Sequence, residues 1–295
     1  MDTTQSDGRA LLLMGLTVVV WGFSWIVMKS MGLYIGPFDL VTLRYAVGLA
    51  AFVVILRVSG QPFRIPPFWF TLGIAIFQTS AFACLVQLAL VAGGAAHVTI
   101  LAYTMPYWAV LFAWALLGER PSGGQAVGLV LAAAGLVAII GPVESLGSVL
   151  SSLLALGGGA AWGLGTVLSK MLFQRHKPNV LSLTMWQMLL GVLLTLPLAL
   201  LWPQRSIDWG IELVMGLLYM GLLASALGWC LWLSVVRRVS TIVAGMSSLA
   251  VPVLVVVLAW LILDERPTSL ELAGMALTMA GLVVVNLSPA RKVIA

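Results

Sequence analysis

The sequence predicts an all-α integral membrane protein of ten transmembrane helices, arranged as two inverted five-helix repeats. Three observations predict this fold class: the composition, the spacing of the apolar segments and an internal repeat. Of the 295 residues, 61% are hydrophobic and 8% are charged, whereas a soluble domain carries about 25% charged residues. A water-soluble fold of this composition would expose large apolar patches and aggregate.

Ten apolar segments are long enough to cross a bilayer, which takes about 20 residues of helix. In chain order they run from Ala10 to Ser30, Pro37 to Val58, Phe68 to Val91, Ala95 to Leu117, Gly124 to Gly141, Val149 to Leu172, Asn179 to Leu201, Ile211 to Val236, Thr241 to Leu263 and Ser269 to Leu287. Only residues 92–94 separate the third segment from the fourth, so we expect a very tight turn there.

Lysines and arginines near the segment ends predict the orientation. With a cytoplasmic N-terminus, eleven of them fall on the cytoplasmic side and three, Lys29, Arg205 and Arg266, on the other. We therefore expect a multi-pass protein of the bacterial inner membrane with cytoplasmic tails at residues 1–9 and 288–295, the first of them disordered. The lipid bilayer is an expected partner, and nucleic acid is not, because the basic residues are spread singly.

An internal repeat relates the two halves of the chain. Adding 146 to a residue number in the first half gives its counterpart in the second, and near the start of each half the offset is 141. Pairs related in this way are Cys84 and Cys230, Pro106 and Pro252, Glu119-Arg120-Pro121 and Glu265-Arg266-Pro267, and, with the smaller offset, Trp21-Gly22 and Trp162-Gly163. The repeats are predicted at residues 10–141 and 149–287. Each holds five helices, an odd number, so the second is inverted relative to the first.

Inverted repeats indicate a transporter, because exchanging the conformations of the two halves converts an inward-open state into an outward-open one. The alternative is an ancient duplication kept only for packing. An enzyme is not expected, since the two histidines, His97 and His176, stand at helix ends and no nucleophile, paired aspartates or metal motif can be assembled with them. No disulfide framework, zinc site or other cofactor is expected either, because Cys84 and Cys230 lie singly in apolar runs.

Several motifs resemble those of the drug/metabolite transporter superfamily, specifically its ten-helix exporters of the EamA type. They are Trp21-Gly22 with Ser24, Pro37 leading to Leu43-Arg44-Tyr45, Pro106, Gly118-Glu119-Arg120-Pro121 and Asp264-Glu265-Arg266-Pro267. Within that group the chain is most similar to the YddG type of aromatic amino-acid and metabolite exporter. The resemblance implies a ten-helix basket, able to work as a monomer, whose central cavity is lined mainly by helices 1, 3, 4, 6, 8 and 9, with helices 5 and 10 outside.

The predicted function is therefore export of small metabolites, amino acids including aromatic ones, by alternating access. All ten acidic residues fall in tails, loops or helix ends, so no carboxylate lies at mid-membrane depth. Proton- and sodium-coupled carriers commonly use such a carboxylate, and its absence favours facilitated transport. The alternative function is efflux of drugs or aromatic cations, with proton coupling as an option.

Trp21 and Trp162 are repeat mates near the centres of helices 1 and 6. Facing each other across a cavity, their rings could stack on an aromatic substrate or attract a cation. The other interpretation is packing, in which each ring covers the glycine notch of a neighbouring helix.

Pro106 and Pro252 lie within helices 4 and 9, where each interrupts the helical hydrogen bonds and could form a gating kink. The carbonyls of Ala102 and Ser248 are expected to lose their helical partners and to face a cavity, because lipid cannot satisfy them. The side chains nearest these breaks are Tyr103, Met105, Trp108, Ser247 and Ser248. A kink without ligand contact is the alternative.

Polar side chains at membrane depth are few and therefore informative. Gln78, with the hydroxyls of Ser24 and Thr99, would suit a zwitterion, although such hydroxyls most often bind their own backbone. Arg44 is the one arginine well within a segment and could pair with a substrate carboxylate. We favour a structural role toward Asp39 or helix-end carbonyls, because helix 2 is not a cavity helix in the resembled family.

Overall fold

The computed structural model describes residues 3–61, 63–92, 98, 101–140, 149–263 and 268–288, and the regular structure within them is helical. The first half contains α1 (Thr3–Met31), α2 (Pro37–Val58), α3 (Phe68–Ile74), the π-helix η1 (Ala75–Ala81), α4 (Phe82–Ala92), α6 (Met105–Leu117) and α7 (Gly123–Ile140). The second half contains α8 (Val149–His176), α9 (Val180–Leu201), α10 (Ile211–Leu218), the π-helix η3 (Tyr219–Leu227), α11 (Gly228–Arg238), α12 (Thr241–Ser247), α13 (Ala250–Leu263) and α14 (Ser269–Leu287).

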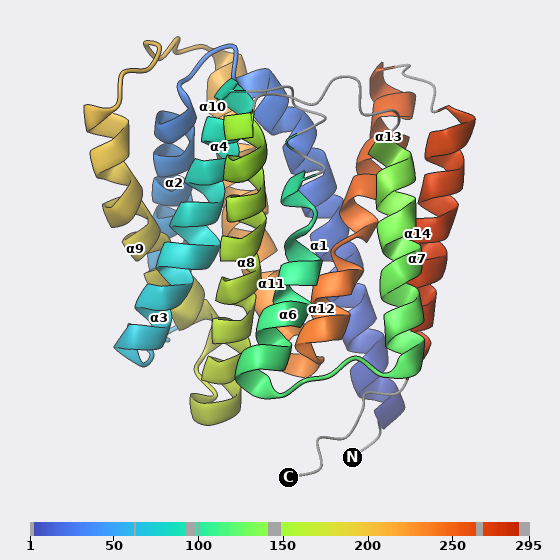
Figure 1. Cartoon of the computed structure of the whole chain (residues 1–295). Helices are drawn as coiled ribbons and strands as arrows, with labels where there is room; N and C mark the ends of the chain where they lie inside the picture. The colour runs from blue at the N-terminus through green and yellow to red at the C-terminus, as the bar shows by residue number, and fades with distance from the viewer. Residues whose placement is uncertain are drawn as a thin grey trace.

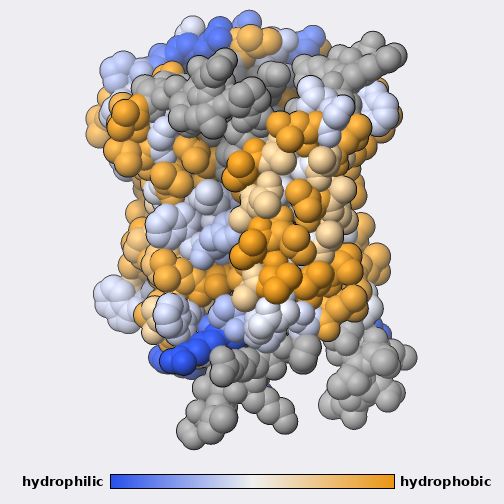
Figure 2. Space-filling view, turned by 45° about the vertical axis from the view of Figure 1, so that its right-hand side comes forward, coloured by the Kyte–Doolittle hydropathy of each residue, from blue (hydrophilic) through white to orange (hydrophobic). Residues whose placement is uncertain are grey.

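These helices stand together as one upright bundle (Figure 1). Seven of the described helical spans are long and apolar enough to cross a membrane, and α6, α7 and α14 add three shorter apolar helices. Figure 2 shows hydrophobic residues forming a belt around the middle of one face, with the most hydrophilic residues at its two ends. Helices suit such a belt because their backbone groups are paired internally and need no water.

The two halves run in opposite directions through the bundle. The span α3–η1–α4 starts at the end that carries the chain termini, whereas its counterpart α10–η3–α11 starts at the opposite end (Figure 1). Both spans contain a π-helix at the matched position, because adding 146 to residues 75–81 gives residues 221–227, which lie within η3. The inverted repeat predicted from the sequence is therefore present in the fold.

The last helix of each half, α7 and α14, lies at one edge of the bundle, and the two pack against each other (Figure 1). Glycines make this contact close: a Cβ on Gly281 would lie 2.6 Å from the carbonyl oxygen of Gly128, and one on Gly135 would lie 2.5 Å from the Thr278 nitrogen. Small residues allow membrane helices to approach in this way. Other helices therefore form the centre of the bundle.

Some boundaries differ from the sequence prediction. Helix α1 begins at Thr3, so most of the tail expected at residues 1–9 is helical. The predicted fourth and ninth segments are each interrupted by a turn, at residues 103–104 and 248–249. Residues 93–94 of the expected tight turn, and the motif at residues 265–267, lie outside the described residues.

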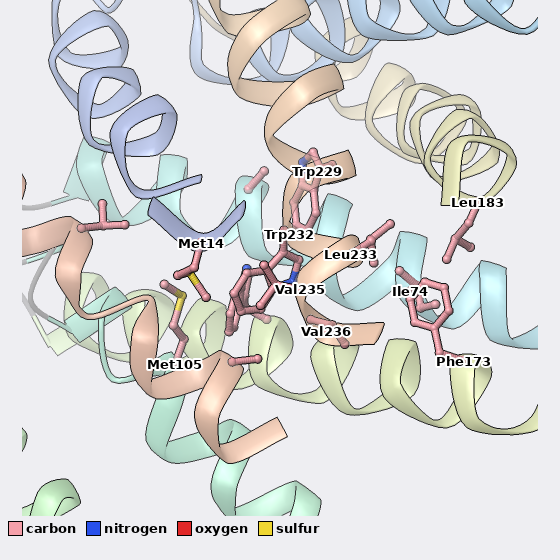
Figure 3. Close-up of a cluster of buried hydrophobic side chains, with 14 of the residues drawn as sticks. Met14, Ile74, Met105, Phe173, Leu183, Trp229, Trp232, Leu233, Val235 and Val236 are labelled. Carbon is pink, nitrogen blue, oxygen red and sulfur yellow. The ribbon is translucent and has the colours of Figure 1, made fainter. Parts of the chain in front are cut away.

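A tryptophan-containing core occupies the middle of the bundle. Helix α11 supplies Trp229, Trp232, Leu233, Val235 and Val236 to it (Figure 3). Trp162 of α8, 1% exposed, and the completely buried Trp232 are among its largest side chains. The cavity described next has this core as its inner wall.

Candidate functional site

A cavity lies inside the bundle and is bounded mainly by the first half of the chain. Its empty volume is about 710 Å³ when the open mouth is counted. The lining residues are Trp21, Ser24, Trp25 and Met28 of α1, Arg44 and Tyr45 of α2, Phe82, Ala83, Val86 and Gln87 of α4, Tyr103 and Met105, and, from the second half, Trp162, Trp229 and Val251.

The cavity extends from the middle of the bundle toward the end opposite the chain termini. Met28 and Gln87 lie near the C-terminal ends of α1 and α4, and both helices end on that side (Figure 1). Trp162 and Trp229, by contrast, lie near the middle of their spans. The cavity therefore reaches mid-bundle depth from one side.

Aromatic rings form the inner wall of the cavity. The ring centroids of Trp162 and Trp232 are 4.6 Å apart, and Trp21 lies 5.7 Å from Trp232 and 5.5 Å from Trp229. Trp232 thus contacts both repeat mates, Trp21 and Trp162, and bridges them from behind the wall. The rings present both faces and edges, which suits an apolar or aromatic group of a solute.

Trp21 both lines the cavity and packs against a glycine of a neighbouring helix. It lines the cavity, and its indole Nε1 donates a hydrogen bond to the carbonyl oxygen of Ala224 in η3 at 3.1 Å. A Cβ on Gly228 would lie 2.5 Å from that Nε1, so the ring edge also covers a glycine notch. The packing contact fixes the ring in the cavity wall.

The polar groups of the cavity come from α1, α2 and α4. The Ser24 hydroxyl donates to the Trp21 carbonyl oxygen at 2.7 Å, which leaves its own oxygen able to accept a hydrogen bond. The Tyr45 hydroxyl donates to the Thr79 carbonyl oxygen in η1 at 3.0 Å. Gln87 lines the cavity and forms no hydrogen bond with another described residue.

Arg44 is the one formally charged residue among those that line the cavity in the described part of the chain. Its Nε donates to the Ser225 hydroxyl in η3 at 3.0 Å, and its guanidinium carbon lies 5.3 Å from the Tyr45 ring centroid. The expected contact with Asp39 is wrong, because α2 packs against η3 and Arg44 binds Ser225 of the second half. The expectation that helix 2 stays outside the cavity is also wrong, because Arg44 and Tyr45 of this helix line it.

The sequence as a whole matches one family of membrane proteins. The model of the EamA-like transporter family matches residues 8–141 and, a second time, residues 149–287. The chain belongs to the EamA-like transporter family. The resemblance seen in its motifs is therefore confirmed at the level of the family.

Relatives of this EamA-like transporter are similar to it along nearly their whole length. A protein of Escherichia coli (strain K12), named a probable amino-acid metabolite efflux pump, is 27% identical over 95% of both chains. A protein of the same name from Salmonella typhimurium is 30% identical, again over 95% of both chains. One solved crystal structure matches with a TM-score of 0.81 and 21% identity over 94% of this chain and 96% of the other, which shows the fold.

Two predicted binding residues of the EamA-like transporter, Gln78 and Trp108, contact other residues and do not line the cavity. Gln78 is completely buried, and its side chain joins the hydroxyls of Thr166 and Ser169 on α8 at 2.8 and 3.2 Å. Trp108 stacks on Phe112 with centroids 6.2 Å apart. Neither is among the residues that line the cavity.

The serines near Pro252 are likewise absent from the cavity lining. Ser247 accepts a hydrogen bond from the Asn286 amide of α14 at 3.4 Å, and the Ser248 hydroxyl donates to the Gly245 carbonyl oxygen at 2.6 Å. Thr99 and His97 lie outside the described residues.

Pro106 and Pro252 stand just after turns rather than inside continuous helices. Pro106 is the second residue of α6, and Pro252 is the third of α13. The Ser248 carbonyl, expected to lack a partner, accepts from the Val251 nitrogen at 3.0 Å. The expectation of an orphaned carbonyl there is therefore wrong, because a turn replaces the kinked helix. The neighbouring Tyr103 does reach the cavity wall.

Repeat symmetry relates part of the lining. Three pairs of mates line the cavity together: Trp21 with Trp162, Ala83 with Trp229, and Met105 with Val251. The sequence reasoning missed Trp25, Tyr45 and Trp229, and it weighed Arg44 as a carboxylate partner but favoured a structural role. The repeat could have indicated Trp229, since it stands beside Cys230 in the matched register.

The end of the EamA-like transporter that carries the termini is tightly packed below the cavity. Trp232, Val236 and Met246 are completely buried there. The Lys170 ammonium donates to the carbonyl oxygens of Val236 and Val239 at the end of α11, the first at 3.2 Å. Glu119 accepts from the Thr241 backbone nitrogen at 3.0 Å, which holds the start of α12. Among the described residues, no group of His, Cys, Asp and Glu is placed to bind a metal ion.

Proposed function

We propose that this EamA-like transporter exports amino acids or closely related small metabolites across the bacterial inner membrane. One observation carries the proposal: a cavity at mid-bundle depth combines a tryptophan wall with the polar groups of Ser24, Tyr45 and Gln87. Such a cavity suits a small amphiphile, because one part of the solute is apolar and another needs hydrogen bonds. The names of the Escherichia coli and Salmonella typhimurium relatives support the same substrate class.

Alternating access of the two repeats is the mechanism that we propose. Exchanging the conformations of the halves replaces each lining residue by its repeat mate. The mates of Trp25 and Met28 are Thr166 and Ser169, which are now buried against Gln78. In the second state Thr166 and Ser169 would line the cavity, and their hydroxyls, which now bind Gln78, would become available to a solute.

The packed end would open in that transition. Lys170 binds the end of α11, and Glu119 binds the start of α12, below the cavity. Their repeat mates, Lys29 and Glu265, come at the same ends of the corresponding segments in the sequence, and inversion of the repeats predicts them on the opposite side of the membrane. We propose that these mates make the equivalent contacts when the cavity faces the other side.

We propose both termini in the cytoplasm and repeats at residues 10–141 and 149–287. We also propose that transport is facilitative. No carboxylate lines the cavity within the described part of the chain, and proton-coupled carriers commonly need one at this depth. The positive charge of Arg44 argues against aromatic cations as substrates, because like charges repel in a poorly solvated cavity. Amino acids remain the better candidates.

Export by cells tests the proposal. Cells preloaded with phenylalanine from a dipeptide should release it into the medium faster when they produce the protein. Replacing Ala83 by Trp, the residue found at its mate Trp229, would fill the cavity and should abolish the increase. A matched control, Ala126→Trp on the exposed face of α7, should release phenylalanine like the wild type. Equal release by A83W and the wild type would contradict a role for this cavity.

A further inference from the structure

Arg44 carries a charge that the described protein does not neutralise. Only its Nε has a hydrogen-bond partner, the Ser225 hydroxyl at 3.0 Å. The four N–H donors of the two Nη groups have no partner among the described residues, and no ion pair involves Arg44 there. The side chain is partly accessible and lines the cavity.

A guanidinium at this depth is costly unless an anion or other strong acceptor accompanies it. Ser225 and the Tyr45 ring, 5.3 Å from the guanidinium carbon, orient the group but add no negative charge. Arg44 is also the one charged residue in a lining that is otherwise aromatic, aliphatic or neutral polar. The missing acceptor is therefore best supplied by whatever enters the cavity.

We infer that Arg44 binds the carboxylate of the transported solute, an inference that rests on the proposed function and narrows its substrate class. A planar guanidinium held at Nε can offer two parallel N–H donors to one carboxylate. A single cation balances one negative charge, so the site favours monocarboxylates over phosphate dianions or dicarboxylates.

The surroundings of Arg44 define the rest of the ligand. The tryptophan wall, with Trp21, Trp162 and Trp229, offers apolar surface. The Ser24 oxygen and the Gln87 amide oxygen can accept hydrogen bonds from an ammonium group. The ligand is thus a compact carboxylate with an apolar or aromatic side chain, and its ammonium group is a secondary determinant.

A comparison of probes that differ only in the carboxylate tests this without relying on transport. Purified wild-type protein is titrated calorimetrically with 3-phenylpropanoate, with phenylalanine and with their neutral amides. The carboxylates should bind at least about tenfold more tightly than the amides, since the amide loses a charge-assisted bond pair. Equal affinities of acid and amide for the wild type would overturn the inference, whatever the variants do.

Variants of Arg44 test whether this residue causes the preference for acid over amide. Arg44→Gln should reduce the preference for acid over amide to less than about threefold, whereas Arg44→Lys should keep part of it, because charge remains but the planar fork does not. Arg57→Gln, an exposed arginine at the end of the same helix, is the matched control and should keep the full preference. A full preference retained by R44Q would refute the assignment.

Failure of the proposed function and failure of the Arg44 assignment give different results. If the wild type binds carboxylates through Arg44 but moves no amino acid in vesicles, the site stands and the export proposal falls. If amino acids are transported while R44Q discriminates acid from amide like the wild type, the export proposal stands and the Arg44 assignment falls.

Discussion

Trp162 and Trp232 stack obliquely, with centroids 4.6 Å apart and planes inclined by 44°. Trp162 lines the cavity and Trp232, completely buried, lies behind it. The pair therefore joins the inner wall of the cavity to the packed end of the bundle. Trp232 Nε1 is buried without a hydrogen-bond partner in the described structure. The contribution of ring packing to stability can therefore be measured separately from that of the indole N–H.

Replacing Trp232 by Ala should remove the support behind this wall and lower stability by about 3–5 kcal/mol, as expected for a buried tryptophan truncated to alanine. Trp232→Phe should cost much less, because it keeps most of the ring and removes a donor that has no partner. Thermal unfolding of the purified protein measures both. Trp209→Ala, at a residue 62% exposed, is the control and should unfold like the wild type.

Gly228→Ala should displace Trp21, because the new Cβ would lie 2.5 Å from its Nε1. Loss of the bond to Ala224 and overpacking together should cost about 1–3 kcal/mol and weaken solute binding, since the ring lines the cavity. Calorimetric titration and thermal unfolding report the two effects. Gly157→Ala on α8, where the nearest atom is 3.7 Å away, should change neither. An unchanged G228A protein would show that Trp21 moves freely.

Gly281→Ile should separate α14 from α7, because even a Cβ would lie 2.6 Å from the Gly128 carbonyl oxygen. We expect a lower melting temperature with unchanged solute affinity, since neither helix lines the cavity. Ala280→Ile, the neighbouring exposed position, is the matched control for side-chain size. A large loss of affinity in G281I at a temperature where it stays folded would contradict the separation of this helix pair from the site.

Cysteine accessibility tests alternating access. The substitutions Met28→Cys and Ser169→Cys are introduced singly into a protein in which Cys84 and Cys230 are replaced by Ala. Residues 28 and 169 are repeat mates, and the proposed transition exposes one in each of the two conformations. A membrane-impermeant thiol reagent should label position 28 only from the outside and position 169 only from the cytoplasm. Conditions that raise the labelling rate at one position should lower it at the other. Labelling of both positions from the same side would rule out an exchange of the two repeats.

The fold could be read from the sequence because the membrane imposes strong constraints on it. Apolar segments of spanning length fixed most helix boundaries to within a few residues, and the Ser269–Leu287 helix agrees with its prediction at both ends. The breaks before Met105 and Ala250 were expected as kinks around Pro106 and Pro252. Proline marks where helical bonding fails, but it does not determine whether the chain bends or turns.

The site was predictable only in part, for physical reasons that differ between residues. Trp21, Ser24, Tyr103 and Trp162 lie in the cavity wall. The repeat had indicated the two tryptophans, membrane depth had indicated Ser24, and the break at Pro106 had indicated Tyr103. Gln78 has the same depth, but its partners on α8 bury it in this conformation, and sequence periodicity does not reveal such partners. Arg44 was assigned to structure because helix 2 is not a cavity helix in the resembled family, yet Arg44 and Tyr45 of this helix line the cavity.

Counterflow in proteoliposomes tests the central claim most directly. Vesicles loaded with unlabelled phenylalanine, tryptophan or threonine should accumulate the labelled amino acid without any ion gradient, and A83W vesicles should not. A pH gradient should leave the initial rate unchanged, because the described cavity lining contains no carboxylate. No accumulation of any of the three amino acids would contradict export of amino acids, and accumulation only with a pH gradient would contradict facilitated transport.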